Sequence, residues 1–347
     1  LCIARFTKFK YVFLTGHHSL FMACLMSAVL GTAGLSGIEL ILVGGFLMGA
    51  WSAISPAIGQ SYTSKVTDGD EIALGHFGSL GYYLSAWVAK YVGKAEESTE
   101  DIEIPEKWGF LRDSTLSTAL TMIVFYLIAA IAAGSEFVAT LSGSMSPYLF
   151  AIMSAMNFAV GVAIVYSGVR MILGDLIPAF QGIATKIIPN AIPAVDCAVF
   201  FTYAPTAVVL GFISSFIGGI IGMLILGAVG GVLIIPGLVP HFFCGATAGI
   251  YGNATGGRRG AAVGSFLNGL AITFLPALAL PVLGQLGFQN TTFGDADFAV
   301  MGLVLGNAFE WIGMAGIYGI VVIAALVLII PNFIKTKGKV INYVEED

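Results

Sequence analysis

Three ionisable residues interrupt apolar stretches of the chain and could bind a polar solute. His17 and His76 each follow a glycine, and Asp196 lies in an Ala-Val-Asp-Cys stretch. Two imidazoles and one carboxylate can hold the hydroxyl groups of a sugar-like substrate through directional hydrogen bonds. Each residue alone could instead make a structural hydrogen bond, but the three together, on separate segments, predict a substrate site.

No pattern of residues indicates catalysis, a metal or a cofactor in this chain. The four cysteines are scattered and form no Cys-x-x-Cys pair. No two His or Cys residues have the spacing of metal ligands on one helix face. His18 must point away from its neighbour His17, and we expect it to be structural. The sequence therefore predicts binding without a nucleophile or a bound cofactor.

The composition predicts that these residues lie within a membrane. Of 347 residues, 57% are hydrophobic and only 10% are charged, whereas soluble chains carry roughly 25% charged residues. The net charge is −5, so there is no basic surplus to hold phosphates. These values exclude an ordinary soluble enzyme, a nucleic-acid binder and a disordered chain. The 45 glycines allow close helix packing in lipid, so we predict an all-α polytopic membrane protein.

Long apolar stretches predict about eight transmembrane helices. A helix needs about 20 apolar residues to cross the bilayer core. Residues 197–240 are long enough for two crossings. Single crossings are predicted for residues 19–38, 40–64, 114–135, 137–169, 260–294 and 311–334.

The basic residues predict how the chain is oriented. They gather in separate clusters, and residues 31–37, 135–146 and 287–298 contain no Lys or Arg. One topology places all 15 basic residues in the cytoplasm, as the positive-inside rule requires. The C-terminus is then cytoplasmic, and the acidic turn with Asp295 and Asp297 is expected to face outward.

Two segments carry too much glycine and proline for simple spans, namely residues 74–92 and 191–205. Broken backbone at membrane depth is tolerated only where it is buried in protein or lines a wet cavity. Paired broken segments indicate a substrate site near the middle of the membrane. We therefore predict that both segments are re-entrant core segments and that they carry His76 and Asp196.

Two further segments are polar enough to lie outside the bilayer core. Residues 94–113 are rich in Asp and Glu and predict an acidic cytoplasmic loop, either a solvated connector or a docking surface for a soluble partner. Residues 174–189 combine apolar residues at helical spacing with polar ones. They predict an interfacial amphipathic helix, which could link a mobile part to a fixed part or simply connect two spans.

Motifs along nearly the whole chain resemble one known family in order and spacing. They are residues 14–17, 66–69 running to 76, 93–101, 167–171, 188–198, 203–209 and 235–240. The family is the ascorbate-specific enzyme IIC, the membrane permease subunit of the bacterial phosphotransferase system.

This resemblance implies that residues 1–347 form one permease unit of the bacterial inner membrane, truncated at its N-terminus relative to the family. Family members are homodimers in which a substrate-carrying core moves against a scaffold in an elevator-like manner. L-ascorbate is phosphorylated at the cytoplasmic side by a phosphocysteine on a separate IIB protein, itself supplied by IIA. On matching positions, the resemblance places His17, His76 and Asp196 in the substrate site.

Two positions depart from the family pattern. The family has Gln four residues after the first His and directly after the second, where this chain has Phe21 and Phe77. Either the chain stacks ascorbate on these rings or its substrate differs. The alternatives are an ion-coupled secondary transporter of a sugar acid or polyol, with Asp196 and the histidines as a proton relay, and a membrane scaffold that transports nothing.

Overall fold

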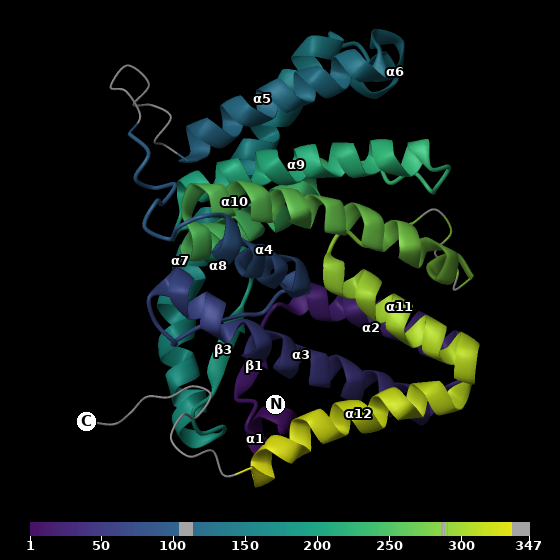
Figure 1. Ribbon diagram of the computed structural model, residues 1–347. Helices are drawn as coiled ribbons and strands as arrows, with labels where there is room; N and C mark the ends of the chain where they lie inside the picture. Colours follow the sequence, from purple (N-terminus) through teal and green to yellow (C-terminus); the bar gives the residue numbers. More distant parts are fainter. Residues whose placement is uncertain (104–113, 286, 288, 290, 335–347) are drawn as a thin grey trace.

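Figure 1 shows the computed structural model of the chain, which is built mainly of helices. The structure describes residues 1–103, 114–285, 287, 289 and 291–334. In chain order the elements are α1 (Cys2–Phe6), β1 (Tyr11–Phe13), α2 (Gly16–Thr32), α3 (Gly37–Thr67), β2 (Ala73–Leu74), α4 (Ser79–Val92), α5 (Ser114–Ala133), α6 (Ser135–Ser142), α7 (Pro147–Lys186), β3 (Ile192–Val195), α8 (Cys197–Phe200), α9 (Pro205–Ala228), α10 (Leu238–Gln285), α11 (Ala296–Ile312) and α12 (Met314–Phe333).

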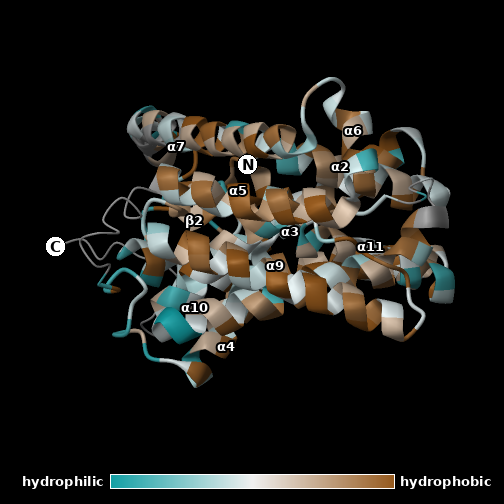
Figure 2. Ribbon diagram, turned by 90° about the horizontal axis from the view of Figure 1, so that it is seen from above, coloured by the Kyte–Doolittle hydropathy of each residue, from teal (hydrophilic) through white to brown (hydrophobic). Residues whose placement is uncertain are grey.

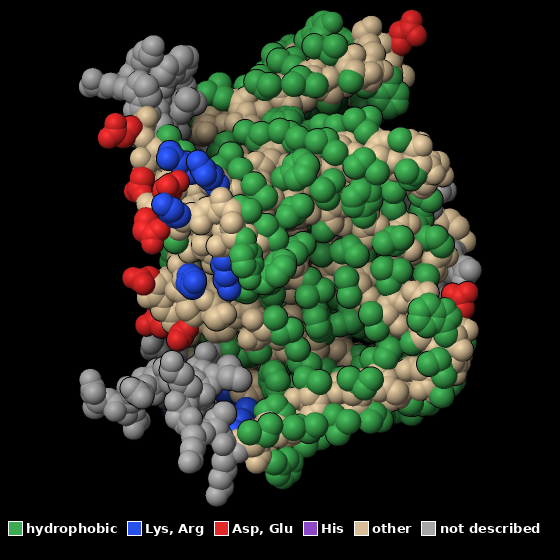
Figure 3. Space-filling view, in the orientation of Figure 1, with side chains coloured by type: hydrophobic (Ala, Val, Ile, Leu, Met, Phe, Trp, Pro, Cys, Tyr) green, Lys and Arg blue, Asp and Glu red, His purple; other side chains and the backbone are tan. Residues whose placement is uncertain are grey.

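Among the described residues, six helices are long and apolar enough to cross a membrane: α3, α5, α7, α9, α10 and α12. Their outward side chains form the broad apolar surface in Figure 3, on which the Lys and Arg side chains gather at one end. Figure 2 shows the same helices as mostly hydrophobic along their length, with hydrophilic residues toward their ends. The chain is therefore a predominantly helical, multi-pass membrane protein, although six is fewer than the eight crossings predicted.

Helix α10 folds as a hairpin of two antiparallel arms, which explains part of that difference. The chain reverses at Gly256 and Gly257, and Gly257 has a φ of 59°. This left-handed backbone favours glycine. Across the hairpin, the Ser265 hydroxyl donates a hydrogen bond of 3.1 Å to the carbonyl of Gly245.

The stretch predicted to hold two crossings, residues 197–240, contains one, α9. Residues 231–237 are non-helical, because Gly230 has a φ of 69° and Pro236 cannot donate to a helix ladder. Apolar length alone could not distinguish this extended connection from a second helix.

A short parallel sheet, which the all-α prediction missed, lies inside the bundle. Its strand order is β1-β3-β2, with Phe13 opposite Ala194 on one side of β3 and Leu74 opposite Val195 on the other. The predicted segment 74–92 consists of the end of β2, a turn and α4, whereas 191–205 consists of β3, the one-turn helix α8 and a turn that leads into α9.

Two apolar clusters hold the helices together. The larger one joins residues of α4, α5, α7, α8, α9 and α10, with Tyr82, Phe212 and Tyr251 among its buried side chains. The other joins residues of α2, α3, α11 and α12 and includes Phe77 and Phe298. The carboxyl ends of the three strands lie between the two clusters, so side chains that follow the strands face residues from both.

The predicted interfacial helix is not a separate element. Residues 174–186 continue α7, a single helix of 40 residues with Pro178 inside it. The chain then turns through Asn190, which has a φ of 61°, into β3. Residues 174–186 therefore link the long helix directly to the central strand of the sheet.

The acidic loop packs on the helix ends beside it over its described part, residues 94–103, while residues 104–113 lie outside the described residues. The carboxylate of Glu100 accepts hydrogen bonds of 3.1 and 3.0 Å from the backbone N–H groups of Thr206 and Ala207 at the start of α9. The amide of Asn253 accepts from Thr99 and donates to Ser98. A carboxylate from a remote loop thus caps α9, whose own N-cap side chain makes no such bond.

Replacing Glu100 with Ala should lower the free energy of unfolding by about 0.5 to 2 kcal/mol, because two N–H groups at the start of α9 lose their acceptor. Thermal unfolding in detergent measures the change. The equally exposed neighbour Glu96 serves as the control, and Glu96→Ala should leave the unfolding midpoint unchanged. Equal midpoints for the two variants would contradict the capping role.

Candidate functional site

The three residues predicted to bind substrate follow the three parallel strands. His17 lies just beyond β1, His76 just beyond β2 and Asp196 directly after β3. Because the carboxyl ends of parallel strands meet at one edge of a sheet, the three side chains are brought together. Thr15 and Gly75 fasten this edge, since the Thr15 hydroxyl donates a hydrogen bond to the Gly75 carbonyl.

A cavity of about 810 Å³ opens at this edge of the sheet. Its polar wall contains His17, His76 and Asp196, as the sequence predicts. Both apolar clusters contribute to the rest of the wall, through Phe243, Cys244, Phe293 and Phe298. Phe21 of α2 and Asp295 complete it. The mixture of a few polar groups with aromatic rings is typical of a site for a small polar molecule.

His17 and Asp196 form the accessible part of the site. The side chain of His17 is 61% exposed, and its Nε2 lies 3.5 Å from Oδ2 of Asp196. The other carboxylate oxygen of Asp196 accepts a hydrogen bond of 3.1 Å from the N–H of Ala198 and so caps α8. Asp196 is therefore held by the backbone while one of its oxygens stays available to a ligand.

The structure separates the two phenylalanines that depart from the family pattern. Phe21 is 52% exposed and lines the cavity, one helical turn beyond His17. Phe77 is fully buried, and its ring stacks on Phe13 with centroids 4.6 Å apart. Its ring also packs edge-on against Phe298. Phe77 therefore lies behind the cavity wall.

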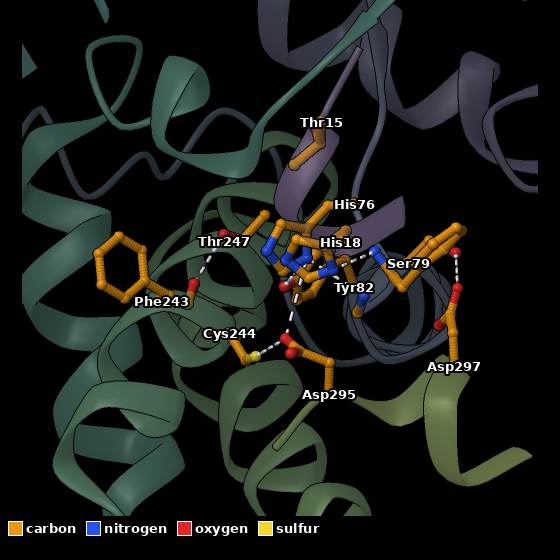
Figure 4. A network of polar contacts seen from close by, with 12 residues as sticks. Thr15, His18, His76, Ser79, Tyr82, Phe243, Cys244, Thr247, Asp295 and Asp297 are labelled. Carbon is orange, nitrogen blue, oxygen red and sulfur yellow. Dashed lines mark hydrogen bonds and ion pairs between the residues drawn. The ribbon is translucent and has the colours of Figure 1, made fainter. Parts of the chain in front are cut away.

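His18 also borders the cavity, next to His76. Figure 4 shows the two rings side by side, and their centroids lie 3.9 Å apart. The backbone N–H of Phe77 donates to Nδ1 of His18 at 3.4 Å, and the N–H of Gly78 donates to Nδ1 of His76 at 3.1 Å. Since each Nδ1 accepts from an amide, each neutral ring carries its hydrogen on Nε2.

Asp295 and Asp297, which the positive-inside rule predicts on the outer side of the membrane, both make contacts inside the protein. Asp297 is fully buried, and Asp295 accepts a hydrogen bond of 2.7 Å from the Cys244 thiol beside His76 (Figure 4). The orientation rule counts basic residues, and it cannot show that α11 begins inside the protein. The signal available in the sequence was Gly294, whose lack of a side chain lets this turn pack on Pro240.

Metal ligation at this cluster is disfavoured by the same hydrogen bonds. Ligand atoms of His18, His76 and Asp295 lie within 4.8 Å of one another. Nδ1 of His76 lies 3.9 Å from Oδ1 of Asp295, but it already accepts from the N–H of Gly78, and Nδ1 of His18 accepts from the N–H of Phe77. A metal on either Nδ1 would displace that bond, and a metal on either Nε2 would require the hydrogen to move to Nδ1.

Comparison with known proteins gives the family. A family model described as "PTS system sugar-specific permease component", EIIC-GAT, matches residues 1–297. One relative is the "Ascorbate-specific PTS system EIIC component" of Mycoplasma pneumoniae, which is 25% identical over 294 residues. The match covers 73% of this chain and 44% of the relative, so the chain spans less than half of that protein's length.

These matches confirm the resemblance seen in the motifs. The chain belongs to the EIIC-GAT family of sugar-specific permease components of the phosphotransferase system (PTS).

Proposed function

We propose that this chain carries the substrate site of a permease that moves L-ascorbate, or a closely related sugar acid, across the membrane for phosphorylation by a separate IIB protein. The observation that carries this proposal is the convergence of His17, His76 and Asp196 on one cavity, in a member of the EIIC-GAT family. The ascorbate-specific relative supports the choice of substrate.

The chemistry of the cavity suits a planar, oxygen-rich ring. Asp196 offers an acceptor for substrate hydroxyls, while His18 and His76 offer Nε2–H donors for acceptor oxygens. Phe21 and the rings of α10 and α11 offer apolar faces on which a flat lactone ring can stack. A flexible polyol has no planar face and no ionised oxygen, so it would use fewer of these groups.

The basic end of the molecule is our candidate for the cytoplasmic side. Lys90 and Arg258 lie at this end with the acidic loop, and the backbone N–H of Arg258 donates to the Glu97 carbonyl at 2.8 Å. The positive-inside rule then places the C-terminal side of α12 in the cytoplasm of a bacterium. We propose that residues 94–103 and Arg258 with Arg259 form the surface that a phosphorylated IIB protein approaches, with IIA as its donor.

We also propose an elevator-type movement in a homodimer. Helices α5, α6 and α7 pack mainly on one another; α5 and α6 lie along the top of the body in Figure 1, while α7 continues toward β3. They meet the body through aromatic contacts such as Phe125 with Phe212 and Phe216. Such an apolar contact can slide, so these helices are the candidate scaffold and the sheet-bearing body the candidate core.

In place of the eight predicted crossings, we propose seven crossing helices together with shorter helices that enter the membrane only in part. Counting the two arms of α10 separately gives seven membrane-crossing helices. The helices α2 and α11, of 17 residues each, are short for a crossing. Each would enter the membrane only as far as the cavity, and the segments 74–92 and 191–205 would be re-entrant from the opposite side.

A binding experiment tests the substrate. The full-length protein in lipid nanodiscs is titrated calorimetrically with L-ascorbate and with the neutral hexitol galactitol. We expect ascorbate to bind at least about tenfold more tightly, a difference of about 1.4 kcal/mol. Tighter binding of galactitol would overturn ascorbate as the substrate and would retain the family assignment.

Replacing Phe21 with Gln should raise the affinity for ascorbate by about two- to tenfold, because an amide in the cavity wall adds hydrogen bonds of about 0.5 to 1.5 kcal/mol. The same titration measures this change. Phe77→Gln is the matched comparison, because it puts an amide into a buried aromatic cluster. We expect it to lower the free energy of unfolding by about 1 to 3 kcal/mol instead. No gain in affinity for Phe21→Gln would place that ring outside the binding contacts.

A further inference from the structure

Asp297 ties three helices together behind the cavity. Its carboxylate accepts hydrogen bonds from Nε1 of Trp51 in α3 at 3.0 Å, from the hydroxyl of Ser79 at 2.7 Å and from the backbone N–H of Leu80 at 3.0 Å. Ser79 and Leu80 form the start of α4. Asp297 is fully buried. Its carboxylate therefore takes its hydrogen bonds from protein groups rather than from bulk water.

The same residue also holds the other end of the turn that precedes α4. The backbone N–H of Asp297 donates a hydrogen bond of 2.9 Å to the carbonyl of Phe77. Residues 77–80 are therefore fixed at both ends by one residue of another helix. Figure 4 shows Asp297 approaching Ser79 from α11, with the two imidazoles on the other side of the turn.

This turn is what orients His18 and His76. Its first two backbone N–H groups, those of Phe77 and Gly78, donate to Nδ1 of His18 and of His76. The Tyr82 hydroxyl, one turn into α4, lies 2.9 Å from Nδ1 of His76. With the hydrogen of His76 on Nε2, the hydroxyl shares Nδ1 with the N–H of Gly78 as a second donor. The tautomers of both rings therefore depend on where the turn lies.

We propose that Asp297 is a positioning residue of the substrate site, whose carboxylate holds the 77–80 turn so that His18 and His76 both present Nε2–H donors at the cavity. This proposal rests on the cavity being the sugar site, as proposed above. Asp297 touches no substrate; it acts through the turn. A carboxylate suits this position because it can only accept, and all three of its partners are donors. An asparagine would direct its NH₂ group at one of them.

The experiment reads the tautomers directly by ¹⁵N NMR of histidine in the full-length protein in nanodiscs. Signals of His18 and His76 are assigned by replacing each in turn with Gln. In the wild type, we expect both rings to carry hydrogen on Nε2 only. In Asp297→Asn, we expect a mixture of tautomers at His76 and a loss of ascorbate affinity of about tenfold or more.

A control separates positioning from stability. Thr63→Val removes a buried hydrogen bond of 2.8 Å to Tyr251 of the larger apolar cluster, away from the cavity wall. It should lower the unfolding midpoint while leaving both the tautomers and the affinity as in the wild type. If Asp297 served only to stabilise the fold, Asp297→Asn would likewise lower the unfolding midpoint without changing the tautomers or the affinity.

A second variant keeps the proposal testable if Asp297→Asn does not fold. Ser79→Ala removes only one of the donors to the carboxylate, and we expect a smaller change in the same direction, about threefold in affinity. If both variants fold and both keep pure Nε2–H tautomers, the proposal is overturned. If only Ser79→Ala folds, pure Nε2–H tautomers in that variant overturn it. A wild type that binds no ascorbate would overturn the proposed substrate, while the tautomers would still decide the role of Asp297.

Discussion

Asp196→Asn should bind the substrate at least about tenfold more weakly than the wild type. The carboxylate of Asp196 stands 3.5 Å from Nε2 of His17 on the cavity wall. A hydrogen bond to a charged group contributes about 1.5 to 3 kcal/mol, and the amide turns one of two acceptors into a donor. The fold should be retained, because asparagine is as good a helix N-cap as aspartate and can still accept from Ala198.

Calorimetric titration of the full-length protein measures this loss. Asp101→Asn, in the exposed part of the acidic loop, makes the same change of charge and should leave the affinity unchanged. Wild-type affinity in Asp196→Asn, with an unchanged unfolding midpoint, would remove Asp196 from the substrate site.

Gly75→Ala should disrupt the site altogether. A Cβ on Gly75 would lie 2.3 Å from the carbonyl oxygen of Ala194 and 2.6 Å from its carbon, and both are backbone atoms of the central strand. The added carbon must push β2 away from β3 and carry His76 with it. Overpacking of this kind costs about 1 to 3 kcal/mol of stability, and we expect substrate binding to fall below detection.

Thermal unfolding and the same titration measure both effects. Gly69→Ala is the matched control, because Gly69 precedes the same strand and a Cβ there would meet nothing within 4 Å. Normal binding by Gly75→Ala would show that the contact between β2 and β3 does not position His76.

The sequence was most informative where polar residues interrupt apolar runs. His17, His76 and Asp196 could be chosen because a charge in lipid is costly, and the structure brings these three residues to one cavity. The family resemblance rested on whole motifs and is confirmed by the family model. The choice of Phe21 and Phe77 came from positions in the family pattern, which cannot tell a cavity-facing ring from one buried behind the wall.

The sequence was least informative about elements that are too short to show a hydrophobic pattern. Strands β1, β2 and β3 have three, two and four residues, too few for alternation to be recognised. Yet this sheet is what gathers the site. The burial of Asp297 could not be predicted for a similar reason, because a half-length helix that begins inside the protein has the same composition as one that begins at its surface.

The most direct test of the proposed function uses membrane vesicles that contain the full-length protein. They are supplied with phosphoenolpyruvate, the soluble phosphotransferase proteins and labelled L-ascorbate, and the form of the label inside is determined. Group translocation predicts ascorbate phosphate, formed only when phosphoenolpyruvate is present. Unmodified ascorbate accumulating with a proton gradient, and without phosphoenolpyruvate, would contradict group translocation and indicate a secondary transporter.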